Sequence, residues 1–277
     1  MRYSDLFQNA VKRLNSPEQA ADVQLLLQKA FNFTPTEYWI HKNDTIQDKN
    51  GVRKFRRYLD RLERHEPIAH IFNEKEFYSR PFFVNKNVLV PRPETELLVE
   101  EAASLLSAPA RVLDIGAGSG VISITLALET GATALALEKS PKAYYVLKKN
   151  IAEHNTGSLV IPIKGDLFPR KKERDFDMVV SNPPYLAAHE WDDLSPTVKY
   201  YDPKEALVSG KSGLEMIEAI IGGAPSVLKN GGHVLMEIGY RQKQDVEELL
   251  RKGRYSDIRF VDDYSGIPRI AVACWKE

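Results

Sequence analysis

The sequence is poor in cysteine, has no excess of charge of either sign and lacks any long apolar run. The single cysteine, Cys274, excludes an internal disulfide and any metal site built from several cysteines. Lysine plus arginine equals aspartate plus glutamate at 38 each, so no whole-molecule field attracts nucleic acid or an anionic membrane. No stretch is long enough to cross a bilayer, and the N-terminus has charges instead of a signal-peptide core. We therefore expect a protein of the cytoplasm.

Residues 1–70 have apolar side chains at helical spacing. Ser16-Pro17-Glu18 and Thr34-Pro35-Thr36-Glu37 each combine a capping hydroxyl, a proline and an early acid, which is typical of a helix start. We predict a small bundle of four or five helices. The helix expected over 53–66 carries six basic and three acidic residues. This is either a solvated helix face or a docking surface for an acidic or RNA-bound partner.

Residues 71–92 change character, and an alternating pattern follows from residue 93 to the end. Strand-like residues around Phe77, 82–84 and 88–90, with a turn at 85–87, predict a β-hairpin that links two domains. From 93 to 277, apolar β-branched runs alternate with helical patterns. The expected strands are 111–115, 132–138, 159–161, 176–181, 234–238, 257–262 and 269–274. This alternation predicts an α/β domain with a mostly parallel sheet and helices on both faces.

A glycine-rich turn follows the first of these strands. Gly116-Ala117-Gly118-Ser119-Gly120 reads G-x-G-x-G, which differs from the G-x-G-x-x-G dinucleotide fingerprint. Glycines allow positive φ and a close approach of backbone to a ligand. Glu138 ends the next strand, where a carboxylate can accept both hydroxyls of a ribose. Asp166 follows the third strand and could accept from an adenine amino group, with Leu167 or Phe168 packed on the ring.

The tetrapeptide Asn182-Pro183-Pro184-Tyr185 follows the predicted strand 176–181. Ligands bind at the carboxyl ends of strands in open α/β sheets. The two prolines carry no N–H, so the loop offers carbonyl acceptors. Asn182 adds an acceptor whose own NH2 can be anchored, and Tyr185 adds an aromatic face. The group suits a planar NH2, although Asn-Pro and Pro-Pro also occur in ordinary turns.

Together these motifs resemble class I S-adenosylmethionine methyltransferases, whose sheet is Rossmann-like. The closer resemblance is to the HemK/PrmC family, the peptide chain release factor glutamine methyltransferases, and it covers nearly the whole chain. The residues that carry it are Glu76-Phe77, 88–96, 114–120, 181–185, Asp202-Pro203, Gly213-Leu214 and 237–239. Two positions depart from the family pattern: Asn73 stands where a glycine is usual, and Leu167 stands where some members have an aromatic residue.

The resemblance implies S-adenosylmethionine as methyl donor and methylation of the side-chain amide nitrogen of the glutamine in the Gly-Gly-Gln motif of release factors. It implies a substrate-docking domain over 1–70, a hairpin linker over 71–92 and a methyltransferase domain over 93–277. Asn182 is then the expected catalytic residue, and 182–185 bind the substrate. The expected cofactor-binding residues are Gly116, Ala117, Gly118, Ser119, Gly120, Glu138, Asp166, Leu167 and Asn182.

Other functions stay open at this point. Asn-Pro-Pro-Tyr also serves DNA adenine and RNA guanine methyltransferases, but those enzymes usually have a strongly basic face, and this chain is neutral. Glutamine methyltransferases that act on ribosomal proteins have a sequence that resembles Pro-Arg-Ser-Pro at the position where this chain has Pro-Arg-Pro-Glu, residues 91–94. A non-catalytic adaptor with this fold would be expected to have lost the glycine-rich turn or the Asn-Pro-Pro-Tyr tetrapeptide, and both are intact here. Six scattered histidines form no metal-ligand motif. We therefore expect no membrane and no sequence-specific nucleic acid among the partners.

Overall fold

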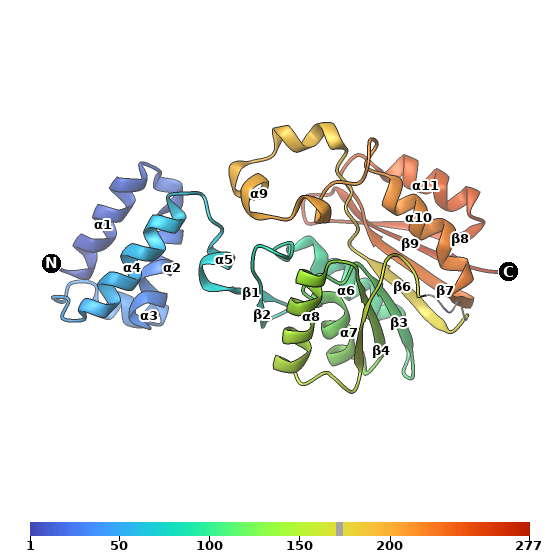
Figure 1. The fold of residues 1–277 in the computed structure, drawn as a ribbon, viewed down its shortest axis with the longest axis horizontal. Coiled ribbons are helices and arrows are strands. Elements are labelled where there is room, and N and C mark those ends of the chain that lie inside the picture. Colours follow the sequence, from blue (N-terminus) through green and yellow to red (C-terminus); the bar gives the residue numbers. More distant parts are fainter. Residues whose placement is uncertain (170–173) are drawn as a thin grey trace. The chain divides into compact units, whose positions relative to one another are not determined.

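The computed structural model describes residues 1–169 and 174–277, and the chain forms two compact units, 1–72 and 73–277 (Figure 1). The first unit is helical. Its helices are α1 (Tyr3–Leu14), α2 (Ala20–Phe31), α3 (Pro35–His41), α4 (Lys49–Leu62) and α5 (Ile68–Phe72), with a 3-10 turn, η1 (Pro17–Gln19), before α2. Its core contains the fully buried Leu26, Leu27 and Phe55. The predicted helical bundle is confirmed.

The two predicted helix starts, at Thr34 and at Ser16, begin different kinds of helix. At α3, the Thr34 hydroxyl accepts from the Glu37 N–H at 3.2 Å, and the Glu37 carboxylate accepts from the Thr34 N–H at 2.7 Å. This reciprocal capping satisfies two N–H groups that have no partner within the helix. The stretch at Ser16 instead begins with η1, so α2 starts three residues after Pro17.

Much of the charge around α4 is used inside the first unit. The Arg13 guanidinium on α1 bonds Asp60 at 2.7 Å and Glu63 at 2.5 Å. Arg61 bonds Glu66 at 2.5 Å and donates to two backbone carbonyl oxygens that follow it. Of the six basic residues counted in the sequence, Arg61 is therefore engaged within the unit.

The hairpin consists of β1 (Glu74–Phe77) and β2 (Arg80–Phe83), paired antiparallel. The prediction placed the hairpin turn at 85–87 and a strand at 88–90. Residues 85–88 do form a turn, closed by the Val88 N–H and the Asn85 carbonyl at 3.1 Å, but it is not the turn of the hairpin, and 88–90 is not a strand. The hairpin turn is Tyr78-Ser79, where both residues have positive φ, 52° and 56°. Such a two-residue turn matches the twist of the strands, but Tyr-Ser lacks the Asn-Gly signal that would reveal it.

The second unit includes this hairpin. Phe77 and Phe82 are buried in the same apolar core as the helices of the sheet domain. Asn150 also exchanges two hydrogen bonds with the backbone of Phe83, at 2.8 and 3.0 Å. Asn73, which stands where the family usually has glycine, adopts φ of 54°, a conformation that asparagine tolerates. The compact boundary thus falls after Phe72, whereas we expected a linker over 71–92.

A seven-stranded sheet forms the centre of the second unit, in the order β5-β4-β3-β6-β7-β9-β8. Its strands are β3 (Arg111–Ile115), β4 (Thr133–Glu138), β5 (Val160–Lys164), β6 (Phe176–Ser181), β7 (Leu228–Glu237), β8 (Tyr255–Asp262) and β9 (Pro268–Trp275). The first five in spatial order are parallel, and β9 runs antiparallel to both neighbours. The predicted mostly parallel α/β sheet is confirmed.

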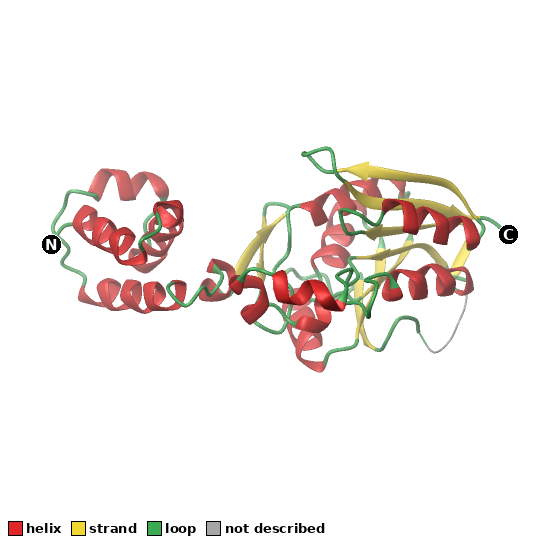
Figure 2. Ribbon diagram, turned by 90° about the horizontal axis from the view of Figure 1, so that it is seen from above, coloured by secondary structure: helices red, strands yellow, loops and turns green. Residues whose placement is uncertain are grey.

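Helices cover both faces of this sheet, as Figure 2 shows. Alternate strand residues belong to two separate apolar clusters, as the period of two in a strand requires. One face packs on α6 (Glu94–Leu105), α7 (Val121–Thr130) and α8 (Pro141–Glu153), and the other on α10 (Glu215–Gly223) and α11 (Lys243–Lys252). Between β6 and β7 lie η2 (Ala188–Asp193), α9 (Pro196–Tyr201), η3 (Lys204–Ala206) and, after α10, η4 (Ala224–Ser226).

The direction of chain progression reverses between β3 and β6. From β3 the chain adds β4 and β5 on one side, and then β6 and β7 on the other. Ligands bind at such a switch point, outside the carboxyl ends of the strands. No helix in 1–169 or 174–277 is both long and apolar enough to span a membrane.

Candidate active site

The glycine loop joins β3 to α7 at the switch point. Gly116, Gly118 and Gly120 have positive φ of 72°, 56° and 85°. A Cβ added at Gly116 would meet nothing within 4 Å, and one at Gly118 would meet only a carbonyl oxygen at 3.8 Å. One added at Gly120 would lie 2.6 Å from Leu147. The first two glycines therefore face open space that a ligand can fill, and the third is needed for packing.

Glu138 lies beside this loop at the end of β4. Its two carboxylate oxygens accept from the N–H of Gly118 at 2.9 Å and from the N–H of Ser140 at 2.7 Å. The side chain is nearly buried. Each carboxylate oxygen can accept more than one hydrogen bond, so the group keeps acceptor capacity for two hydroxyls. Ala117 and Ser119 are buried in the loop, and the Ser119 carbonyl accepts from the Asn150 side chain at 2.7 Å.

Asp114, inside β3, lies next to the glycine loop and Glu138, although the sequence analysis did not assign it a role. It is fully buried, and one carboxylate oxygen accepts from the Ser123 N–H at 3.2 Å. The other oxygen has no hydrogen-bond partner among the described residues. Burial raises the pKa of Asp114 to about 7, the bonds from Ser123 oppose the rise, and the charge of Glu138 adds to it. A charged residue within an apolar strand was the signal that could have singled it out.

Asp166 and Leu167 follow β5 at the same edge of the sheet. The Asp166 carboxylate is half-exposed and pairs with the Lys139 ammonium at 2.6 Å. This contact raises the pKa of Lys139. Leu167 has φ of 56° and packs against the apolar cluster on the α10 and α11 face. The Gly165 N–H donates to the Glu138 carbonyl at 3.1 Å, so Asp166 lies next to the end of β4, with Lys139 as its partner.

Asn182 follows β6, directly beside the glycine loop. Ile115 and Ser181 are paired in the β3–β6 register, and the Ser181 hydroxyl donates to the Ile115 carbonyl at 2.7 Å. The Asn182 NH2 donates to the Thr95 hydroxyl oxygen on α6 at 3.1 Å. No donor from 1–169 or 174–277 bonds its side-chain oxygen. The sequence predicted an anchored amide with a free acceptor, and the structure supplies the anchor.

Pro183, Pro184 and Tyr185 continue this loop across the sheet edge. The Tyr185 carbonyl accepts from the Gln242 side chain at 2.9 Å, and the Gln242 oxygen accepts from the Gly239 N–H at 2.8 Å. A Cβ at Gly213 would collide with that same carbonyl. Burial raises the pKa of the Tyr185 hydroxyl above its ordinary value. The loop is thus held by the segment between β7 and α11 and by the chain before α10.

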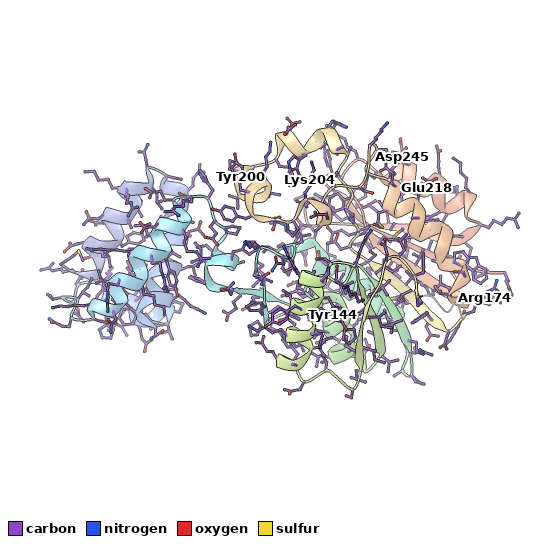
Figure 3. All side chains as sticks on the ribbon, viewed as in Figure 1. Tyr144, Arg174, Tyr200, Lys204, Glu218 and Asp245 are labelled. Atoms are coloured by element: carbon purple, nitrogen blue, oxygen red, sulfur yellow. The ribbon has the colours of Figure 1, made fainter. Side chains whose placement is uncertain are left out.

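The segment between β6 and α10 is tied to the rest of the unit by a buried acid. The Asp202 carboxylate accepts from the Arg92 guanidinium at 2.8 Å and from the Val90 N–H at 3.4 Å. Burial raises the pKa of Asp202, and Arg92 opposes the rise. Figure 3 labels Tyr200 and Lys204 on this segment; Tyr200 is exposed, and the Lys204 ammonium lies 5.0 Å from the ring centre of Trp191.

Thr95 and Glu237 are two further residues that the sequence analysis missed as site residues. The Thr95 hydroxyl donates to the Glu237 carboxylate at 2.6 Å, and both side chains are 2 % exposed. Burial raises the pKa of Glu237 to about 7. Glu237 ends β7 as Asn182 follows β6, and the two strands are paired in register. The carboxyl ends of β5, β4, β3, β6 and β7 thus carry Asp166, Glu138, the glycine loop, Asn182 and Glu237.

Comparisons with known proteins identify relatives of this chain. Residues 5–72 match the family model of the PrmC N-terminal domain, and residues 93–196 match that of the methyltransferase small domain. The release factor glutamine methyltransferase of Cereibacter sphaeroides is 35% identical over 99% of this chain and 98% of its own length. That of Caulobacter vibrioides is 35% identical over 92% of this chain and 89% of its own length. The crystal structure of a methyltransferase from Pyrococcus furiosus shares the fold, with a TM-score of 0.55 and 20% identity over 79% of this chain and 98% of its own.

Proposed function

The chain belongs to the family of release factor glutamine methyltransferases, and from that premise we propose its reaction. It transfers a methyl group from S-adenosylmethionine to the side-chain amide nitrogen of the glutamine in the Gly-Gly-Gln motif of peptide chain release factors. The observation that carries this proposal is the anchored amide of Asn182, whose NH2 is held by Thr95.

The substrate amide sets the chemical problem. An amide nitrogen is a weak nucleophile because its lone pair is delocalised into the carbonyl group. The Asn182 side-chain oxygen and the Pro183 carbonyl oxygen each accept one N–H of the substrate amide, which directs the nitrogen lone pair towards the methyl group. Positive charge grows on the nitrogen during transfer, and these fixed acceptor dipoles stabilise it. The methylated nitrogen then releases a proton to solvent, and no side-chain base is required for the attack.

S-adenosylmethionine supplies a methyl group on a positively charged sulfur, which leaves as a neutral thioether. The loop of Gly116, Ala117, Gly118, Ser119 and Gly120 fits beside this group, because the structure leaves open space at Gly116 and Gly118. Glu138 would accept the ribose hydroxyls, Asp166 would accept from the adenine amino group, and Leu167 would pack on the ring. These assignments rest on positions along one edge of the sheet.

The N-terminal unit is the part that we assign to docking of the release factor. It contributes no residue to the site described above, and α4 presents Arg56 and Arg57 as exposed basic side chains. The neutral composition of the chain supports a protein substrate over a sequence-specific nucleic acid. The methyl-transfer chemistry proposed above does not depend on this docking role.

Incubation of the protein with labelled S-adenosylmethionine and purified release factors tests the proposal. Mapping of the product should find the label on the glutamine of Gly-Gly-Gln. A release factor in which that glutamine is replaced by alanine is the control and should stay unlabelled. Label on a ribosomal protein or on a nucleic-acid base, with release factors unlabelled, would contradict the proposal.

A further inference from the structure

We propose that Thr95 and Glu237 are positioning residues for methyl transfer, because they determine which end of the Asn182 side-chain amide faces the substrate. This inference rests on the proposed function and deepens it. The three side chains come from three elements: Thr95 from the first turn of α6, Glu237 from the end of β7 and Asn182 from the end of β6.

The direction of each hydrogen bond follows from the chemistry of the groups. An ionised carboxylate only accepts, so the single proton of the Thr95 hydroxyl points to Glu237, at 2.6 Å. The Thr95 oxygen then has only lone pairs to offer to Asn182, at 3.1 Å. Asn182 must therefore turn its NH2 to Thr95 and its oxygen to the open side. That is the acceptor that the substrate amide needs.

The opposite orientation would put two donors against each other. If the Asn182 amide were flipped, its NH2 would face the NH2 of the substrate, and its oxygen would face the Thr95 lone pairs. A buried donor or acceptor that is left without its partner is unfavourable. The chain from Glu237 through Thr95 to Asn182 therefore selects one orientation before the substrate arrives.

The burial of Glu237 is costly, and the structure compensates for it only in part. Burial raises the pKa of Glu237 to about 7, helped by the charge of Glu94, whereas the Thr95 hydrogen bond and the charges of Arg269 and Arg92 lower it. The nearby Tyr185 hydroxyl stays neutral because burial raises its pKa. A buried carboxylate with so perturbed a titration is common at functional sites. A role in orienting the Asn182 amide accounts for the presence of a carboxylate at this buried position.

Protonation of Glu237 would remove the selection. A neutral carboxyl can donate to the Thr95 oxygen, which frees the Thr95 proton to point to Asn182 and favours the flipped amide. The transfer rate at saturating substrates should therefore fall as the pH drops below about 7. Saturation with S-adenosylmethionine separates this effect from changes in cofactor binding, to which Glu138 and the buried Asp114 near it belong.

The first test replaces Thr95 and compares it with another buried threonine. Thr95→Val keeps the shape and removes the hydroxyl, and Thr95→Ser keeps the hydroxyl. Thr125→Val is the matched control, since Thr125 is fully buried on α7 and its hydroxyl has no partner among the described residues. Single-turnover transfer to a release factor should fall on the order of 10- to 100-fold in Thr95→Val. Thr95→Ser should restore most of it, and S-adenosylmethionine affinity should be unchanged in all three.

The second test asks whether Thr95 acts through Asn182. In an Asn182→Ala background, Thr95→Val should cause no further loss of transfer, because there is no amide left to orient. If the two losses multiply, Thr95 acts independently and the inference is overturned. Transfer by Thr95→Val as fast as that by Thr125→Val would overturn it as well.

The third test uses Glu237→Gln, which also serves if Thr95→Val does not fold. Glutamine can donate as well as accept, so the proton of Thr95 is no longer committed. We expect Glu237→Gln to transfer the methyl group more slowly than the wild type, at a rate that does not change from pH 6 to 8. At about pH 8 the variant should be at least as thermally stable as the wild type, because it lacks the buried charge. If Glu237 had a purely structural role, Glu237→Gln would lose stability and its transfer rate would depend on pH as that of the wild type does. That result would overturn the inference. A wild-type protein that methylates no release factor would instead contradict the proposed function itself, and this inference with it.

Discussion

Two carboxyl groups of the site, Asp114 and Glu237, are fully withdrawn from water. Burial raises the pKa of each to about 7, from ordinary values of 3.8 and 4.5. Between those values and pH 7 the folded protein binds more protons than the unfolded chain, so protonation favours the fold. That contribution is complete below the ordinary pKa values and is lost as the pH rises through about 7.

We therefore predict that the free energy of unfolding of the ligand-free protein decreases from about pH 5.5 to about pH 7.5, by up to roughly 1.4 kcal/mol per pH unit for each group. Urea denaturation at several pH values measures this slope. Asp114→Asn and Glu237→Gln should each flatten it. Variants whose slopes match that of the wild type would show that these two carboxyls do not carry the effect.

The residues of the site differ in how far sequence could reveal them. Asn182 stands in a recognisable tetrapeptide after an apolar strand, and its position at a strand end was predictable. In the sequence, Thr95 lies 87 residues before Asn182, and Glu237 lies 55 residues after it. No local pattern connects them with Asn182. Only the packing of α6 and the β6–β7 register brings the three together.

At the scale of the element, the glycine loop has two different requirements. Gly116 faces open space, whereas Gly120 packs against Leu147. Alanine at Gly120 would combine a clash with an unfavourable positive φ, so we predict a loss of stability of about 1–3 kcal/mol. Alanine at Gly116 should destabilise less and should mainly weaken binding of S-adenosylmethionine. Denaturation and calorimetry on both variants separate these effects; equal losses of stability would contradict the distinction.

The hydrogen bonds of α4 decide how its proposed docking role can be tested. Arg61 should be left intact, because it holds Glu66 and two backbone carbonyls within the unit. Reversal of the exposed Arg56 and Arg57 to Glu should raise KM for the release factor and leave cofactor affinity unchanged, because charge complementarity acts mainly on encounter. The same reversal at Arg251 and Lys252, exposed at the end of α11, is the control. Equal KM values in both variants would make α4 an ordinary solvated face.

The hairpin shows where local sequence signals fail. Asn85-Lys86-Asn87 looked like the turn, because asparagine is common in turns, but the strands pair around Tyr78-Ser79. The Tyr78 N–H donates to the Glu96 carboxylate at 2.7 Å, so contacts with α6 support an unusual turn. The strands β3 and β6, in contrast, have the bounds that the sequence predicted, since short apolar runs are typical of the buried strands of a parallel sheet.

At the scale of the whole molecule, every residue assigned to cofactor binding lies in the second unit. We predict that residues 73–277, expressed alone, fold and bind S-adenosylmethionine. A fragment that starts at residue 93 should be unstable, because it loses Phe77 and Phe82 from the core. Calorimetry on both fragments, with circular dichroism to confirm folding, measures this. A folded 73–277 fragment without binding would contradict the assignment.

The central claim is that the Asn182 side-chain oxygen holds the substrate amide while its NH2 is anchored by the protein. Single-turnover methyl transfer at saturating release factor and S-adenosylmethionine tests it most directly. Asn182→Ala should fold and bind the cofactor nearly as the wild type does, and should lose transfer by roughly 100-fold or more. The loss should lie in kcat, because the bond strengthens as the nitrogen becomes positive. Transfer by Asn182→Ala at a rate close to that of the wild type would contradict the account.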